Sequence, residues 1–195
     1  MTTIVDLGIG NISNVKRPID GKVTNDPYQI EKAEKIIVPG VGNFSEVKEN
    51  FSKLKGVISD FVAEDKPFLG ICLGMQILFG YNEEGGVEGL DILEGEVIRL
   101  RKTLSPHIGW NTVRFDSEDA LFEGISNQSF FYYTHSYYVD TDMNLIGETR
   151  LCSCNEGSWI PAVINSNNIY GTQFHPEKSG SNGVKLLKNF ESLEV

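Results

Sequence analysis

Basic residues are scarce in this chain, and their scarcity narrows the range of partners. The 195 residues include 17 Lys and Arg against 27 Asp and Glu, which gives a formal net charge of −10 at pH 7. A surface of that sign repels phosphate backbones and anionic lipid headgroups. We therefore expect neither nucleic acid nor a membrane surface as a partner.

Long apolar runs and cysteines are scarce as well. No stretch approaches the roughly 20 apolar residues of a membrane span, and the opening residues MTTIVD lack the features of a signal peptide. Three cysteines do not indicate a disulfide framework in a chain of this length. Cys152 and Cys154 could form half of a metal site, but no second Cys/His pair has suitable spacing. We therefore predict free thiols beside a strand, no metal site and a cytoplasmic location.

Nucleotide-binding glycine motifs are incomplete. Two Gly-x-Gly turns occur at residues 8–10 and 40–42, but Ser13 and Ser45 occupy the position of the third glycine in G-x-G-x-x-G. The sequence also contains no G-x-x-x-x-G-K-[ST] phosphate loop. We therefore predict no nucleotide-binding role and no cofactor.

Short apolar runs are present near the start of the chain, at residues 4–7, 36–38 and 68–71, and each leads into a glycine-containing turn. Unalternated runs separated by helical patterns are typical of parallel strands covered on both faces. Between residues 87 and 175 the pattern becomes strand-rich. We predict one domain over residues 1–195, an α/β doubly wound and mainly parallel mixed sheet with helices on both faces and antiparallel additions in the second half.

Two helices are clearly indicated. The first follows Gly42, with Asn43 as its predicted N-cap and an apolar stripe from Phe44 to Leu54. The last covers about residues 182–193, and its inward-facing residues are predicted to be Val184, Leu187 and Phe190. By contrast, the segment between Val15 and Pro27 contains Pro18, Asp20 and Gly21 and is a poor helix former. We predict a truncated first crossover and an edge strand at residues 22–25.

Residues 70–76 (GICLGMQ) carry the strongest indication of chemistry. Glycines on both sides of Cys72, between an apolar run and a helical pattern, suit the sharp strand-to-helix turn that exposes a nucleophile. A following helix N-terminus would stabilise a thiolate, and the N–H of Leu73 would supply half of an oxyanion hole. A cysteine buried only for packing is the alternative, and this segment alone does not decide between the two.

A candidate base and its orienting carboxylate lie near the end of the chain. Pro176 favours an extended His175, and residues two apart in an extended chain project to one side, so His175 and Glu177 can face one site. A carboxylate beside an imidazole fixes its tautomer and stabilises the imidazolium. A surface His-Pro-Glu turn is the alternative, but the position after the apolar run 169–174 is that of a strand end. The turn at residues 39–42 could supply a second oxyanion donor, or it could be an ordinary turn.

Two further segments stay open on the residues alone. His135 follows the aromatic run 130–133, and a lone histidine there is more often structural than functional. Residues 106–111 (PHIGWN) are predicted to form a loop with an exposed aromatic. Its Trp110 is either core filler or a partner anchor.

These motifs together resemble the triad class of glutamine amidotransferases. Within that class the chain is similar to the glutaminase subunits of imidazole glycerol phosphate synthase. The matching segments are residues 10–11, 39–42, 72–76, 106–111 and 174–179. The resemblance covers nearly the whole chain and implies the flavodoxin-like fold of a single type 1 glutamine amidotransferase domain.

The resemblance also implies roles for individual residues. Cys72 would attack the glutamine carboxamide, and His175, held by Glu177, would protonate the leaving ammonia and then activate water. The implied oxyanion hole consists of Val41, Gly42 and Leu73. The implied glutamine-binding residues are Gly40, Gln76, Glu84, His135, Ser136 and Tyr137. The implied partner face consists of Asn11, Asn14, Trp110, Tyr132 and Lys178.

In the family that the chain resembles, a (β/α)₈-barrel cyclase subunit uses the ammonia. The products are imidazole glycerol phosphate and aminoimidazole carboxamide ribotide, in histidine biosynthesis. The resemblance therefore implies a cytoplasmic heterodimer with glutamine as its substrate.

Two departures from the family pattern keep alternatives open. Leu7 stands where the family usually has an aromatic residue, and the shortened segment between Val15 and Pro27 adjoins the implied partner face. A paralogous subunit could instead supply ammonia for amidation or amidination of a surface-polysaccharide nucleotide sugar. A non-catalytic regulatory protein on the same fold is a third hypothesis, and the intact Cys72, His175 and Glu177 argue against it.

Overall fold

The computed structural model describes residues 1–101, 105–115, 119–143, 145–151 and 158–194. The helices are α1 (Ile12–Lys16), α2 (Pro27–Glu31), α3 (Phe44–Ala63), α4 (Leu73–Gln76) and α5 (Gly180–Ser192), with short 3₁₀ turns η1 (Ala120–Phe122) and η2 (Pro176–Lys178). The strands of the large sheet are β1 (Thr2–Val5), β2 (Gly21–Thr24), β3 (Lys35–Gly40), β4 (Phe68–Cys72), β9 (Arg114–Phe115), β12 (Leu145–Leu151), β13 (Ser158–Ser166) and β14 (Ile169–Thr172).

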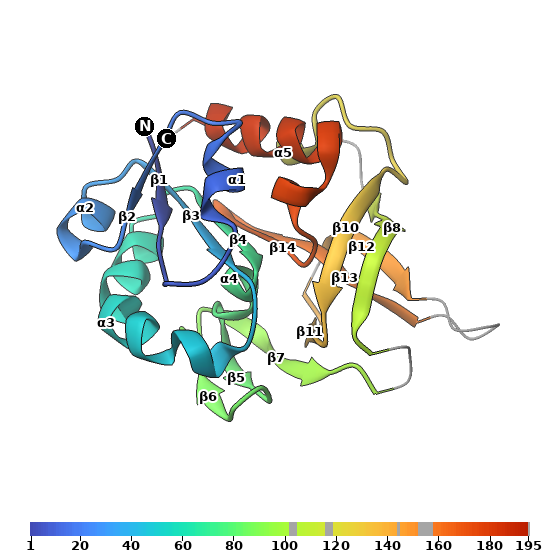
Figure 1. The fold of residues 1–195 in the computed structure, drawn as a ribbon, viewed down its shortest axis with the longest axis horizontal. Coiled ribbons are helices and arrows are strands. Elements are labelled where there is room, and N and C mark those ends of the chain that lie inside the picture. The colour runs from blue at the N-terminus through green and yellow to red at the C-terminus, as the bar shows by residue number, and fades with distance from the viewer. Residues whose placement is uncertain (102–104, 116–118, 144, 152–157, 195) are drawn as a thin grey trace.

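These eight strands are ordered β2-β1-β3-β4-β14-β13-β12-β9, and all of them except β9 are labelled in Figure 1. The first five are parallel to one another, and β13, β12 and β9 are added antiparallel. The predicted α/β mixed sheet with antiparallel additions is confirmed. Because β3, β4 and β14 are parallel neighbours, their carboxyl ends lie together at one edge, where sheets of this type bind ligands.

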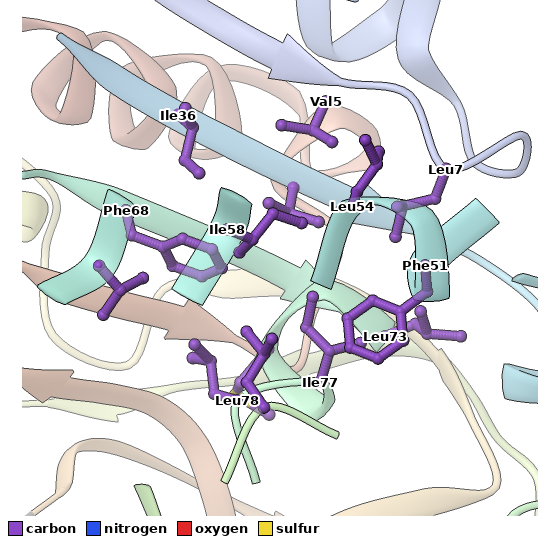
Figure 2. Packing of buried hydrophobic residues seen from close by; sticks show 14 of the residues in the cluster. Val5, Leu7, Ile36, Phe51, Leu54, Ile58, Phe68, Leu73, Ile77 and Leu78 are labelled. Atoms are coloured by element: carbon purple, nitrogen blue, oxygen red, sulfur yellow. The ribbon is translucent and has the colours of Figure 1, made fainter. Parts of the chain in front are cut away.

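Successive residues of the parallel strands point to opposite faces of the sheet, which divides the core into two layers. One face packs against α3, and the buried layer between them contains Val5, Ile36 and Phe68 from the strands and Phe51 and Ile58 from α3 (Figure 2). The other face packs against α1 and α5, and the buried layer there contains Ile4, Ile37, Leu69 and Ile71 from the strands, with Val15 from α1 and Leu187 and Phe190 from α5. The unalternated apolar runs of the sequence are explained by this burial on both faces.

Both predicted helices are present, and one detail of the second was wrong. Asn43 caps α3 as predicted, with its side chain accepting the N–H of Ser45. In α5, however, Val184 is 39% exposed, so it does not face inward. The buried residues of α5 are Gly183, Leu186, Leu187 and Phe190. The helix is turned this way because Gly183 lies against the carbonyl of Pro176, where a Cβ would approach the oxygen to 1.9 Å.

Two smaller sheets stand beside the large one. The first pairs β8 (His107–Thr112) with β10 (Phe130–His135), and the second has the strands β5 (Phe79–Asn82), β6 (Val87–Glu88), β7 (Leu93–Arg99) and β11 (Tyr137–Asp140). The prediction of a loop at residues 106–111 was wrong, because residues 107–112 pair in register with β10. Pairing with a strand that follows some 20 residues later outweighs the local turn signals of Pro106 and Gly109.

The first crossover is short, as predicted. The five-residue α1 leads directly into β2, which forms the edge of the large sheet. Cys152 and Cys154 lie outside the described residues. Within the described part of the chain, no helix is both long enough and apolar enough to cross a membrane.

Candidate active site

Cys72 stands at a strained turn between β4 and α4. Its backbone has φ +54° and ψ −103°, a conformation that costs a non-glycine residue of the order of 1–3 kcal/mol and is found chiefly at functional sites. A Cβ on Gly70 would lie 2.3 Å from the carbonyl oxygen of Gly74, and one on Gly74 would lie 1.7 Å from that of Val38. Glycine is therefore required on both sides of the cysteine, as the elbow interpretation predicted.

His175 and Glu177 form a buried pair next to this turn. His175 Nδ1 lies 2.9 Å from Glu177 Oε1, and both side chains are almost fully buried. The backbone of His175 is held by two bonds: its N–H donates to the carbonyl of Tyr132 at 2.8 Å, and its carbonyl accepts the hydroxyl of Ser179 at 2.6 Å. The pairing through Nδ1 leaves Nε2, which is buried without a hydrogen bond to the described residues, available for chemistry.

The charge on His175 follows from its neighbours. Burial lowers the pKa of the imidazole, but attraction to a Cys72 thiolate and to the Glu177 carboxylate outweighs burial and raises the pKa of His175 to about 9. At neutral pH the residue is therefore an imidazolium, the partner that a thiolate requires. The four-residue α4 contributes little to this balance, because so short a helix has a small macrodipole.

A pocket of about 320 Å³ opens beside the sulfur of Cys72, a volume at the small-molecule end of the range for ligand sites. Its lining contains the predicted oxyanion residues and most of the predicted glutamine-binding residues. The lining residues are Val41, Gly42, Cys72, Leu73, Gln76, Glu84, Pro106, Ile108, Thr134, His135, Ser136 and Tyr137. Gly40, which was predicted to bind glutamine, is not among these lining residues; it is buried at the end of β3, where a Cβ would lie 2.8 Å from Leu73 Cβ. Its role in binding glutamine stays a prediction.

Glu84 connects the pocket to the start of α3. Its Oε2 accepts the backbone N–H of Phe44 at 3.0 Å, and its own N–H donates to the side chain of Asn82 at 2.8 Å. Half-burial raises the pKa of the Glu84 carboxyl above its usual range, although the bond from Phe44 opposes this. The carboxylate thus anchors the helix that follows the loop of Val41 and Gly42.

Sequence reasoning missed His107 as a neighbour of the site. Its Nδ1 lies 3.0 Å from His135 Nε2, and His135 Nδ1 lies 2.8 Å from the carbonyl of Tyr137. Burial lowers the pKa of His107 to about 4. Burial and the neighbouring His107 lower the pKa of His135 to about 3. Both rings are therefore neutral at neutral pH, and only the pairing of β8 with β10 brings them together.

Gln173 was also missed. It is fully buried, and its Nε2 lies 3.5 Å from the sulfur of Cys72. The signal was present in the sequence, because a glutamine inside the otherwise apolar run that precedes His175 needs a polar partner in the interior.

Three of the residues predicted to form the partner face contact one another. The rings of Trp110 and Tyr132 meet edge to face at 6.0 Å between centroids, and Lys178 Nζ lies over the Tyr132 ring at 5.7 Å. Trp110 is 55% exposed. Asn11 and Asn14, at and within the start of α1, are partly exposed, and α1 packs against η2, which contains Lys178.

The described residues offer no group of three or more His, Cys, Asp or Glu side chains placed to hold a metal ion. What the site provides is a strained thiol, a buried imidazole–carboxylate pair and an adjacent polar pocket. This arrangement is suited to nucleophilic acyl transfer.

The sequence and the fold have known relatives. The family model for class-I glutamine amidotransferases matches residues 5–192. The HisH subunit of imidazole glycerol phosphate synthase from Pyrococcus furiosus is 50% identical over 192 residues, covering 97% of each chain. The HisH subunit from Thermococcus kodakarensis is 47% identical over 195 residues, covering 99% of this chain and all of the relative.

Solved structures share the fold at lower identity. A crystal structure of a glutamine amidotransferase superposes with a TM-score of 0.74 at 15% identity, covering 97% of this chain and 96% of that one. A chain of PurLQS from Thermotoga maritima superposes with a TM-score of 0.70 at 18% identity, again covering 97% of this chain and 96% of that one. At these identities the likeness shows the fold alone.

Proposed function

Because the chain belongs to the class-I glutamine amidotransferases, and within them to the HisH subunits of imidazole glycerol phosphate synthase, we propose that it is the glutaminase subunit of that synthase. It hydrolyses glutamine to glutamate and ammonia and delivers the ammonia to a synthase subunit in histidine biosynthesis. The observation that carries this proposal is the strained Cys72 beside the buried His175–Glu177 pair, at the mouth of a pocket of about 320 Å³.

The reaction has two half-steps. The Cys72 thiolate attacks the side-chain carbonyl carbon of glutamine, and His175 gives its proton to the nitrogen as the C–N bond breaks and ammonia leaves. A water then attacks the thioester, His175 takes a proton from it, and the C–S bond breaks to release glutamate and the thiolate. In both steps the N–H of Leu73 and those of Val41 and Gly42 hold the oxyanion.

The pocket has groups for the rest of the substrate. Glu84 provides a carboxylate for the α-ammonium of glutamine. Gln76, His135, Ser136 and Tyr137 surround the remaining polar atoms. His135 and the neighbouring His107 are both neutral at neutral pH. The charge that selects an amino acid is therefore that of the Glu84 carboxylate.

The partner is a (β/α)₈-barrel cyclase subunit that binds over Trp110, Tyr132 and Lys178, next to α1. Ammonia released into water at neutral pH becomes ammonium, which is not a nucleophile, so direct transfer between subunits preserves the reactive form.

The test combines the purified chain with the cyclase subunit of the histidine pathway. We expect glutamate release that the loaded partner stimulates and that Cys72→Ala lowers by at least about 10³-fold. The control supplies ammonium salt instead of glutamine, and the Cys72→Ala complex should then form product normally. Unchanged glutamate release in Cys72→Ala would refute the catalytic assignment. Failure to bind or respond to this partner would favour the nucleotide-sugar alternative.

A further inference from the structure

Gln173 lies against the nucleophile but has no part in the triad. Its side-chain Nε2 is 3.5 Å from Cys72 Sγ, within reach of an N–H···S hydrogen bond. Its backbone N–H donates to the carbonyl of Ala162 at 2.9 Å, which fixes the residue to the neighbouring strand β13. With no exposed surface, the side chain has no water to compete for its donors.

The orientation of the Gln173 amide is determined by its neighbours. The carbonyl of Tyr137 can only accept hydrogen bonds, and Gln76 Nε2 lies 3.1 Å from it. The same Gln76 nitrogen lies 3.2 Å from Gln173 Oε1. Turning the Gln173 amide over would place two NH₂ groups against each other. The Gln173 oxygen therefore faces Gln76, and its N–H group faces the sulfur.

A second contact supports this orientation of the Gln173 amide. His135 Nδ1 also lies 2.8 Å from the Tyr137 carbonyl, so that carbonyl accepts from two side chains and holds the residues 135–137 next to Gln76. The side-chain donors of His135, Gln76 and Gln173 each point toward an acceptor, and the last of these acceptors is Cys72 Sγ. A sulfur at the accepting end is best matched as a thiolate, because a bond from N–H to an anion is roughly twice as strong as one to a neutral acceptor.

We propose that Gln173 is a second stabiliser of the Cys72 thiolate, acting through its amide N–H alongside the His175 imidazolium. The proposal rests on the proposed function, because it deepens the role of the same nucleophile. In the resting site Gln173 favours the state with the proton on His175 and the charge on sulfur. In the second half-step, when the C–S bond breaks and its electrons return to sulfur, the same N–H stabilises the departing thiolate.

The first test measures alkylation of Cys72 by iodoacetamide in the full chain, followed on the Cys72-containing peptide by mass spectrometry. Gln173→Met keeps the length and apolar volume of the side chain but removes the donor. We expect alkylation near neutral pH to slow by about ten-fold, on the scale of hydrogen bonds to charged groups, and to approach the wild-type rate at alkaline pH. Gln29→Met, the same change on α2 outside this cluster, is the matched control and should leave the rate unchanged.

Alkylation rates that match the wild type across the whole pH range in a folded Gln173→Met variant would overturn the proposal. A second measurement needs no Gln173 variant. The side-chain amide protons of Gln173 should shift in NMR spectra between the wild-type chain and the Cys72→Ala variant, and an unchanged resonance would also overturn the proposal. Neither test requires glutamine or the partner, so a failed glutaminase assay and a failed role for Gln173 are distinguishable.

Discussion

At the scale of single residues, the site contains all three histidines of the chain in two opposite electrostatic environments. Burial lowers the pKa of His175, but the interactions with Cys72 and with the Glu177 carboxylate outweigh burial and raise this pKa to about 9. His107 and His135 lie against each other and against carbonyl or amide groups, and burial lowers their pKa values to about 4 and about 3. The charged imidazole is thus confined to the position that exchanges protons with the nucleophile.

These values predict how stability depends on pH. Unfolded histidines titrate near pH 6.5, so below this pH the unfolded chain binds protons that folded His107 and His135 reject, and stability falls as the pH decreases toward about 4. His175 acts in the opposite direction: its contribution is fully present below pH 6.5 and is lost as the pH rises through about 9. The free energy of unfolding should therefore decline on both sides of pH 6.5.

The variant His107→Gln separates the decline of stability below pH 6.5 (the acid limb) from the decline above it (the alkaline limb). Removing one titrating group should reduce the slope of the unfolding free energy against pH on the acid limb by at most about 1.4 kcal/mol per pH unit, and by less than this because His107 is only partly buried. The slope on the alkaline limb should not change. Urea unfolding of both proteins across this pH range is the measurement, and superimposable acid limbs would contradict the assignment.

At the residue level, the sequence singled out the features whose signal is local. Cys72 with its two glycines, and His175 with Pro176 and Glu177, lie within short segments whose covalent geometry limits what they can do. Gln173 and His107 were not found as site residues, because their roles depend on contacts with residues about 30 to 100 positions away. Those contacts exist only after strands have paired.

At the scale of elements, the site is assembled from the ends of β3, β4, β5, β10 and β14 and the connections that follow them. The helix α3 fixes one of these connections, since Asn43 caps its first turn and Glu84 accepts the N–H of Phe44. The helix was predictable from its cap and apolar stripe. The strand β8 was not, because its proline and glycine favour a turn locally and only pairing with β10 overrides them.

Gly56, within α3, offers a test of the helix alone. A Cβ at this position would meet no atom within 4 Å, and alanine is favoured over glycine in a helix interior by about 0.5–1 kcal/mol. Gly56→Ala should therefore raise the melting temperature by about 1–4 °C in calorimetry and leave glutaminase activity unchanged. Gly74→Ala is the opposing control, since its Cβ would collide with the carbonyl of Val38. A destabilised Gly56→Ala protein would contradict the description of α3.

At the scale of the whole molecule, the pocket and the proposed partner face share the same elements. On β8, Ile108 lines the pocket and Trp110 is exposed two residues further on. On β10, Tyr132 contacts Trp110 and accepts the backbone N–H of His175. Lys178 follows His175 by one turn. A subunit that binds this face would therefore contact β8 and β10, the strands that position His175. This is where a partner would have to act to stimulate hydrolysis.

Trp110→Ala tests that face. The side chain is 55% exposed in the free chain, so its removal should alter the melting temperature little. If it anchors the partner, its removal should weaken the complex by about 2 kcal/mol or more, which is roughly 30-fold in Kd, and should reduce the stimulation of glutamate release by the cyclase subunit.

The control uses the other tryptophan of the chain. Trp159 on β13 is also exposed, and it stacks with Arg114 rather than with Tyr132 or Lys178, so Trp159→Ala should leave Kd and stimulation unchanged in titration calorimetry. Equal weakening by both variants would mean that loss of aromatic surface in general weakens the complex. If Trp110→Ala leaves Kd unchanged, the partner binds at another face. The contacts among Trp110, Tyr132 and Lys178 would then serve the fold alone.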